Sequence, residues 1–223
     1  MNTTEKKKRH GLFYSRGEET VNSISHGIGI AMGVVFGTLF LLKCHQIQDP
    51  WATFGIWLYL FGMGGSYIAS TLYHAMKHHS PWKRRLRHWD HAAIYWHIAG
   101  SFSPITLTVL RDEAAWGWGL FGFVWFCAII GTIVSFRKME EHSHIETVCF
   151  IVMGLSILAV FKALFAIAET SCYWIIAEGV CYITGTLFYS FRHIRYMHSV
   201  FHFFVLAGSA CHLVAIWYVL EML

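Results

Sequence analysis

Long apolar runs separated by short polar segments dominate this chain. A run of about 20 apolar residues is long enough to cross the hydrocarbon core of a bilayer as an α-helix. Seven segments have this character, at residues 21–42, 51–74, 90–110, 116–136, 145–166, 172–191 and 198–220. The pattern predicts an all-α fold: a seven-helix transmembrane bundle over residues 21–223, preceded by a cytoplasmic N-terminal segment at residues 1–20.

The composition supports a membrane protein. Of 223 residues, 56% are hydrophobic and 13% are charged, which departs from the average of soluble proteins. The formal net charge of +4 is small and spread over several short segments, so it does not indicate a nucleic-acid partner. The six cysteines lack Cys-x-x-Cys spacing, so neither a disulfide framework nor a thiolate metal site is predicted. We expect a multi-pass protein of the cell membrane, and nothing in the sequence specifies its oligomeric state.

The basic residues predict the orientation, because Lys and Arg are enriched in cytoplasmic loops. Fourteen of the 17 precede the first segment or follow the second, fourth and sixth. The opposite side has only Lys43, Arg111 and Lys162. This asymmetry predicts a cytoplasmic N-terminus and an outside C-terminus.

Five polar residues from three segments are predicted to meet at one membrane depth. Polar side chains in membrane helices usually face a partner or a cavity. Ser70 and His74 close the second segment on the cytoplasmic side, and Asp90 opens the third on that side. His198 and His202 open the seventh segment, four residues apart and therefore on one helix face.

Three imidazoles with a nearby carboxylate are typical of a catalytic zinc site, although imidazole ligands also suit iron and copper. We expect His74, His198 and His202 to hold the metal. Asp90 would hold a metal-bound water or take its proton, and Ser70 would hydrogen-bond to that carboxylate, to His74 or to the substrate. Each pair alone is a weak pattern in a chain with 15 histidines. Asp90 has a second interpretation, as the N-cap of the third helix.

Other polar residues in the apolar segments have less specific interpretations. At the start of the first segment, a group of four either lines the site or, as we favour, ties helix ends together: Glu18, Glu19, Asn22 and His26. His97 and His212 are expected to form hydrogen bonds between helices, and Glu178 to be solvated or hydrogen-bonded. Pro104 predicts a kink in the third helix.

Four stretches of the chain resemble the hemolysin III branch of the progestin and adiponectin receptor superfamily. They are EETVNSISHGIG, ASTLYHA, RHWDHAAIYWHIAGSFSPITL and YMHSVFHFFVLAGSACHLVAI. The resemblance implies seven helices, a cytoplasmic N-terminus and a zinc ion near the cytoplasmic side. It places the zinc-ligand positions on His74, His198 and His202, and the serine and aspartate positions on Ser70 and Asp90.

Several functions are consistent with these features. The leading hypothesis is a zinc-dependent intramembrane hydrolase of lipid amides or esters, similar to ceramidases and connected to membrane lipid homeostasis, with a membrane lipid as substrate or ligand. The alternative is a non-enzymatic sensor or receptor of membrane state, in which zinc is structural. A third hypothesis, a cytolytic protein, follows only from the name of the family branch. The apolar segments show no charged ring of the kind typical of a pore. Bis-histidine haem binding is disfavoured because the histidines gather at one end of the bundle.

Overall fold

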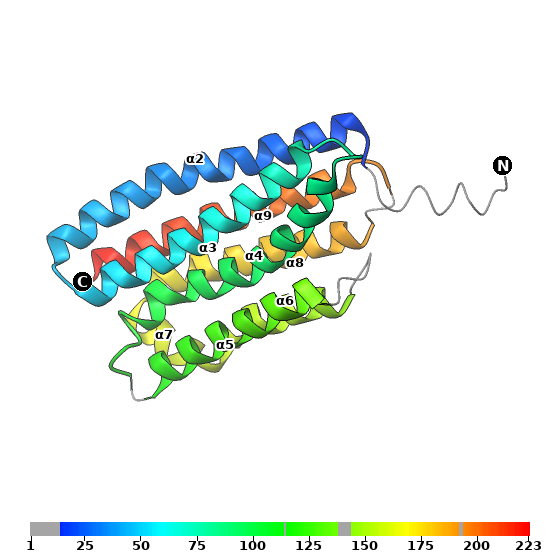
Figure 1. Ribbon diagram of the computed structural model, residues 1–223. Coiled ribbons are helices and arrows are strands. Elements are labelled where there is room, and N and C mark those ends of the chain that lie inside the picture. Colours follow the sequence, from blue (N-terminus) through cyan, green and yellow to red (C-terminus); the bar gives the residue numbers. More distant parts are fainter. Residues whose placement is uncertain (1–13, 114, 138–143, 192–193) are drawn as a thin grey trace, which may run out of the picture.

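The computed structural model describes residues 14–113, 115–137, 144–191 and 194–223. The described chain is all-helical and contains no strand (Figure 1). Its elements are α2 (Arg16–Ile47), α3 (Pro50–Ala75), α4 (Pro81–Thr106), α5 (Trp116–Arg137), α6 (His144–Leu155), the 3₁₀ helix η1 (Ser156–Ala159), α7 (Phe161–Ile167), α8 (Glu169–Ser190) and α9 (Met197–Glu221). Each of the seven expected segments overlaps a helix or a broken run of helices. Residues 1–13 of the expected N-terminal segment lie outside the described residues.

The start of α4 corrects the expected third segment. The helix begins nine residues before Asp90, where Ser80 is the N-cap, its hydroxyl accepts a hydrogen bond from the Trp82 amide, and Pro81 takes the first helical position. Both residue types favour a helix start. The interpretation of Asp90 as an N-cap is therefore wrong. The helix ends at Thr106, so Pro104 lies in its last turn.

The expected fifth segment is broken rather than continuous. Helix α6 ends at Leu155, η1 follows, and α7 starts at Phe161, with a bend of 56° across the break. The Ser156 hydroxyl donates to the Met153 carbonyl at 2.6 Å, next to Gly154. Glycine and serine commonly accompany helix kinks, and serine side chains compete for backbone carbonyls. The segment length was predicted correctly, whereas its break was not.

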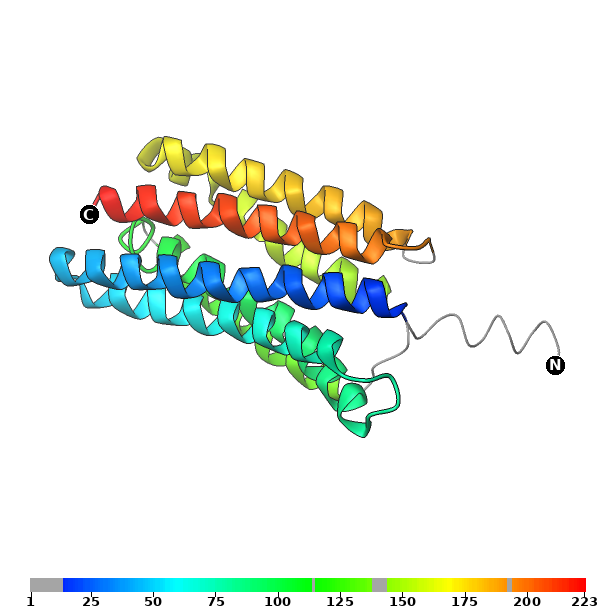
Figure 2. The same cartoon turned by 90° about the horizontal axis from the view of Figure 1, so that it is seen from above.

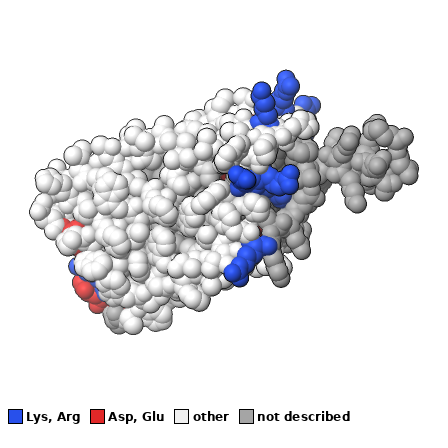
Figure 3. Space-filling view, in the orientation of Figure 1, with Lys and Arg blue, Asp and Glu red and all other residues white. Residues whose placement is uncertain are grey.

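The surface and the helix lengths indicate a membrane protein. By length and hydropathy, α2, α5 and α9 qualify as membrane spans, and the bent α6–α7 run qualifies if it counts as one span. Helices α3, α4 and α8 do not meet this criterion. Large apolar side chains such as Val34 and Phe126 are exposed to the surroundings. Figure 3 shows Lys and Arg gathered mainly at one end of the molecule, with a nearly uncharged surface between the two ends.

The helix packing brings the ends of α2, α3 and α9 together. Helix α3 packs against α2 and α4, while α9 lies between α8 and α2 (Figure 2). Two glycines allow the closest approach of α3 and α4, since a side chain at Gly62 would collide with the Trp96 carbonyl and one at Gly100 with the Leu58 carbonyl. Small residues allow such backbone contact between membrane helices. Because α2 and α9 begin where α3 ends, one end of the bundle collects their terminal residues (Figure 1).

Candidate metal centre

Three imidazoles converge at this end of the bundle. His74 comes from the last turn of α3, and His198 and His202 come from the first turns of α9. Their ligand atoms all lie within 4.8 Å of one another. In the part of the chain that the structure describes, this is the only group of three or more His, Cys, Asp or Glu residues with such proximity. The three predicted ligands are therefore brought together by the fold.

His74 presents one nitrogen to the cluster and the other to a carboxylate. Its Nδ1 lies 2.6 Å from Glu19 Oε2, and Nε2 is buried without a hydrogen-bond partner. The carboxylate accepts this hydrogen bond, so Nδ1 is the donor, and in a neutral imidazole Nε2 then has a free lone pair. Metal-binding histidines commonly have this carboxylate–histidine arrangement, which fixes the ring and raises its basicity.

His198 and His202 face each other across one turn of α9. Their Nε2 atoms are 3.0 Å apart, close to the roughly 3.3 Å expected between two nitrogen ligands of one tetrahedral zinc ion. His202 is buried, and its Nδ1 lies 3.5 Å from the Ser25 hydroxyl. His198 is half-buried as a residue, and the Tyr14 ring stacks on it at 4.5 Å. Tyr14 thus covers one side of the cluster.

Two glutamates at the start of α2 have different partners and hold this helix in place. Ser15 and Glu18 form a capping box, and Glu18 also accepts a hydrogen bond from the Tyr196 amide at 2.7 Å. This contact joins the start of α2 to the start of α9. Glu19 is buried and pairs with both His74 and Lys83, whose Nζ lies 2.8 Å away. Lys83 therefore compensates the buried charge that orients His74.

The next polar residues of α2 line the cluster. The Ser199 hydroxyl donates to Asn22 Oδ1 at 2.6 Å, which joins α2 to α9. The His26 ring stacks on the His202 ring at 3.8 Å and meets Tyr67 edge-on at 5.1 Å. The favoured expectation, a helix tie, holds for Asn22. His26 instead lies against the site.

Ser70 and Asp90 lie outside the imidazole cluster. Ser70 is buried one turn before His74 on α3, and Asp90 is half-buried in the third turn of α4. No hydrogen bond between described residues links either of them to the three imidazoles. Their predicted catalytic roles therefore stay predictions.

A second histidine–carboxylate pair lies elsewhere in the bundle. His212 Nδ1 is 2.7 Å from Glu178 Oε2, and His212 Nε2 is 3.1 Å from the Ser101 carbonyl. The pair joins α4, α8 and α9. The expectations of a hydrogen-bonded His212 and Glu178 are confirmed, and neither residue belongs to the metal cluster.

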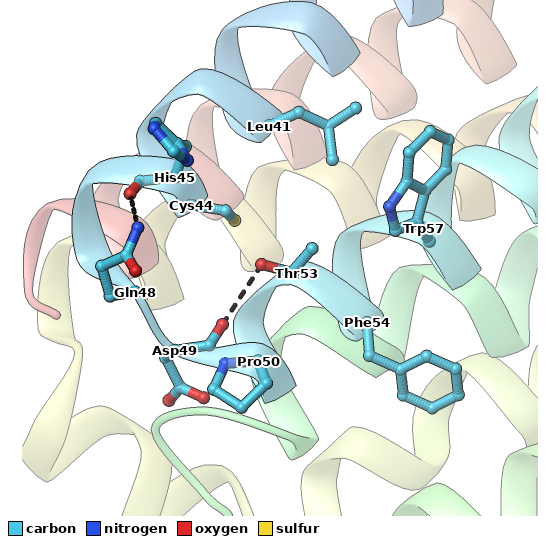
Figure 4. Close-up of a pocket in the computed structure, with 9 residues that line it drawn as sticks. All are labelled: Leu41, Cys44, His45, Gln48, Asp49, Pro50, Thr53, Phe54 and Trp57. Carbon is cyan, nitrogen blue, oxygen red and sulfur yellow. Dashed lines mark hydrogen bonds between the residues drawn. The ribbon is translucent and has the colours of Figure 1, made fainter.

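A hollow at the far ends of α2 and α3 also lies away from the cluster. Its lining includes Cys44, His45, Asp49 and Trp57 (Figure 4). Cys44 is 25 residues beyond Glu19 on α2, roughly 37 Å along a helix. This hollow does not contribute to the candidate metal centre.

Sequence reasoning did not assign the carboxylate partner of His74. Charged residues are common just outside a membrane span, so Glu19 did not stand out. A spacing signal was present: Glu19, Asn22 and His26 follow one another at intervals of three and four residues, which puts them on one helix face. That face is the one that α2 turns toward the cluster.

The donor set suits a metal ion of the zinc type. Three imidazoles match a site with three protein ligands and an open fourth position, and the buried, unpartnered His74 Nε2 is a ligand atom in need of a partner. The residues present therefore fit a metal.

Comparisons with known proteins agree with the sequence motifs. The family model described as Haemolysin-III related matches residues 14–213. The chain is 31% identical to Hemolysin-3 of Bacillus cereus over 208 residues, or 93% of both chains. It is 29% identical to the Hemolysin-3 homolog of Bacillus subtilis (strain 168) over 194 residues, 86% of this chain and 90% of that one. It is also 27% identical to human Monocyte to macrophage differentiation factor over 213 residues, 90% of this chain and 83% of that one. The chain therefore belongs to the haemolysin III family, within the progestin and adiponectin receptor superfamily.

Proposed function

We propose that the protein binds Zn²⁺ through His74, His198 and His202 and hydrolyses an amide or ester bond of a membrane lipid. The observation that carries the metal assignment is the orientation of His74, with Nδ1 on Glu19 and a buried, unpartnered Nε2 toward the other two imidazoles. Zinc in such a site lowers the pKa of a water molecule and polarises a carbonyl group.

The proposed topology has seven membrane spans, with the N-terminus in the cytoplasm, in a cell membrane. It is supported by the helices that overlap all seven predicted segments and by the Lys and Arg residues gathered mainly at one end (Figure 3). In this orientation the imidazole cluster lies near the cytoplasmic surface. Water from the cytosol can reach the cluster while the acyl chain stays among the helices.

The α3–α4 register supports roles for Ser70 and Asp90. Gly62 lies against His97, and the helices are antiparallel neighbours. Ser70 lies eight residues after Gly62 on α3, and Asp90 lies seven residues before His97 on α4. The two residues are therefore at about the same height along the helix pair. We assign Asp90 the role of general base and Ser70 that of a donor that orients the substrate.

Aspartate substitution tests this function. Asp90→Asn removes the base but no imidazole, so the purified variant is expected to keep its zinc and lose fatty-acid release from a panel of lipid amides and esters. Ser23→Ala is a control, since the Ser23 hydroxyl contacts the Thr71 carbonyl and, among the described residues, no hydrogen bond joins it to the three imidazoles. A zinc-loaded wild-type protein that releases no fatty acid from any lipid of the panel would contradict the hydrolase.

A structural zinc in a sensor of membrane state is the second candidate. It is favoured by the contacts that already join helix ends beside the imidazole cluster. Two of them join the start of α2 to the start of α9: Glu18 with the Tyr196 amide, and Asn22 with Ser199. A sensor is expected to keep its metal and its cellular phenotype in the Asp90→Asn variant. Loss of both activity and phenotype with the metal retained favours the hydrolase.

A further inference from the structure

A second group of polar side chains lies in the middle of the bundle, apart from the imidazole cluster. Its centre is the pair of Glu178 and His212, each nine residues from the far end of the bundle, where α8 begins and α9 ends (Figure 2). At 1.5 Å per residue, this places the pair about 14 Å from that end. Four neighbouring hydroxyl groups complete a set that we call the central polar line: Tyr59, Tyr67, Glu178, Tyr182, Ser209 and His212. Tyr182 is half-buried and the other five residues are buried.

The Glu178–His212 pair contains one shared proton, whichever of the two groups carries it. His212 Nε2 lies 3.1 Å from the Ser101 carbonyl, which only accepts hydrogen bonds, so Nε2 is protonated. The contact of 2.7 Å between Nδ1 and Glu178 Oε2 needs one further hydrogen, on the imidazole or on the carboxyl group. Among the described residues, His212 is the only basic side chain within ion-pair distance of Glu178. Loss of the shared proton would therefore leave an uncompensated negative charge inside the bundle.

The titratable groups that face the pair come from four helices. Tyr59 of α3, Tyr182 of α8 and Cys211 of α9 interact electrostatically with the Glu178 carboxylate. His97 of α4 interacts with the His212 imidazole. Phenols and thiols become negative when they ionise, so they do not balance a carboxylate. The shared proton is therefore the charge that neutralises the pair.

A chain of hydroxyl groups leads from the pair toward the imidazole cluster. Tyr182 follows Glu178 by one turn on the same face of α8. Its hydroxyl lies 3.1 Å from the Ser209 hydroxyl, which accepts a hydrogen bond of 2.7 Å from the Tyr67 hydroxyl. Each hydroxyl group both donates and accepts hydrogen bonds. The three groups can therefore pass a proton along the chain, with one proton entering at one end as another leaves at the other.

These residues are ordered along the bundle. Counted from the far end of its own helix, Glu178 lies about 14 Å, Tyr182 about 20 Å and Tyr67 about 25 Å along the axis. The Tyr67 ring then meets the His26 ring edge-on at 5.1 Å, and the His26 ring stacks on His202. The central polar line thus runs from the middle of the bundle to within one side chain of the imidazole cluster.

Two further hydroxyl groups continue the polar character toward the far end. The hydroxyls of Tyr59 and Ser171 are buried and have no hydrogen-bond partner. The Tyr59 ring lies 5.3 Å from the His212 ring, and Ser171 lies two turns before Glu178 on the same face of α8, next to the start of that helix. A buried hydroxyl without a partner costs about 1–3 kcal/mol, so these groups do not stabilise the fold. Their placement fits a route for protons between the far end and the pair.

We propose that the central polar line carries protons across the membrane, with the Glu178–His212 pair as its proton-binding site. Ionisable residues inside membrane helices are costly and commonly mark ion or proton pathways. A proton that arrives from the far end binds to the pair, and one proton leaves through the hydroxyl chain toward the water at the cluster end. The number of protons in the line is the same before and after each transfer, and the direction follows the electrochemical gradient. The inference uses the membrane topology proposed above and does not depend on lipid hydrolysis.

Proton flux into liposomes tests the inference. The full-length protein is reconstituted into liposomes that contain a pH-sensitive dye, and a potassium gradient with valinomycin makes the interior negative. We expect the interior to acidify several-fold faster than in protein-free liposomes. Glu178→Gln keeps an oxygen that accepts from His212 but cannot bind the proton, so its rate should fall to that of protein-free liposomes. Tyr182→Phe interrupts the hydroxyl chain and should lower the rate several-fold.

The controls separate this result from folding and from catalysis. Tyr173→Phe makes the same exchange at an exposed position of α8, where the hydroxyl donates to Glu169, and should pass protons as the wild type does. Tyr182→Phe keeps the Glu178–His212 pair, so it tests the line even if Glu178→Gln does not fold. A wild-type rate equal to that of protein-free liposomes would overturn the inference, as would wild-type rates in both line variants. Lipid hydrolysis by a protein that passes no protons would refute the proton path and leave the proposed function in place.

Discussion

Two buried histidine–carboxylate pairs in this molecule have the same partner type at Nδ1 of the imidazole and differ in the surroundings of Nε2. His74 contacts Glu19 at 2.6 Å, and His212 contacts Glu178 at 2.7 Å. The Nε2 of His74 has no partner in the protein and faces two more imidazoles, whereas the Nε2 of His212 lies 3.1 Å from the Ser101 carbonyl.

The second nitrogen decides what each pair can do. A carbonyl oxygen only accepts, so Nε2 of His212 carries a proton and offers no lone pair to a metal. That histidine ties α4, α8 and α9 together. His74 has its proton on the carboxylate side, which leaves Nε2 as a ligand. Burial and a carboxylate partner alone therefore do not identify a metal ligand.

The largest expected effect is on zinc content, and it should differ between substitutions of two histidines on α9. His202→Ala removes one of three ligands, so we expect zinc per purified chain to fall from about one to near zero. His212→Leu, ten residues along α9, should keep the wild-type zinc content. Elemental analysis after purification with zinc present measures both. Zinc loss in both variants would indicate general unfolding and contradict the separation.

The second prediction concerns stability at the other pair. His212→Leu leaves the Glu178 carboxylate buried without its partner, which costs about 3–5 kcal/mol for a broken buried pair. We expect a clear drop in melting temperature in detergent micelles. The double variant with Glu178→Leu should recover much of the loss, because no buried charge remains. A single variant as stable as the wild type would show that the pair is not a structural tie.

The third prediction concerns the carboxylate that orients His74. Glu19→Gln can still accept a hydrogen bond from Nδ1 but loses the charge and the ion pair with Lys83. Loss of such a supporting partner typically lowers metal affinity 10–100-fold, and we expect the lower end, about tenfold. Competition with a chelator of known affinity measures the change, with Glu18→Gln as the adjacent control. Equal zinc affinity in wild type and Glu19→Gln would remove Glu19 from the site.

The smallest expected effect concerns the aromatic cover. Tyr14→Ala removes the ring stacked on His198, and ring pairs contribute about 0.5–1.5 kcal/mol. We expect zinc to be lost to a chelator a few-fold faster, with unchanged stoichiometry. Tyr14→Phe keeps the ring and should exchange zinc at the wild-type rate. A rate in Tyr14→Ala equal to that of Tyr14→Phe would argue against a covering role.

The sequence contained enough information to predict that three imidazoles meet and that the fold is helical. Apolar runs have a length set by the bilayer, and His198 and His202 are four residues apart within one such run. Their meeting with His74 followed from alternating helix directions. None of these inferences needed the details of side-chain packing.

Other features depended on contacts that a linear pattern does not reveal. Residues 81–89 are largely basic and aromatic, so an apolar-run criterion missed the first turns of α4, although Ser80 and Pro81 signalled a helix start. The break after Leu155 coincides with a contact between the Ser156 hydroxyl and the Met153 carbonyl. The partners of Glu19 became evident only when its carboxylate was placed against His74 and Lys83.

The central claim is that three imidazoles from α3 and α9 hold one zinc ion. X-ray absorption at the zinc edge of the purified, zinc-loaded wild type tests it most directly. We predict nitrogen and oxygen ligands at about 2.0–2.1 Å, with scattering from three imidazoles. A shell with sulfur at about 2.3 Å, or a spectrum with no imidazole scattering, would contradict the claim.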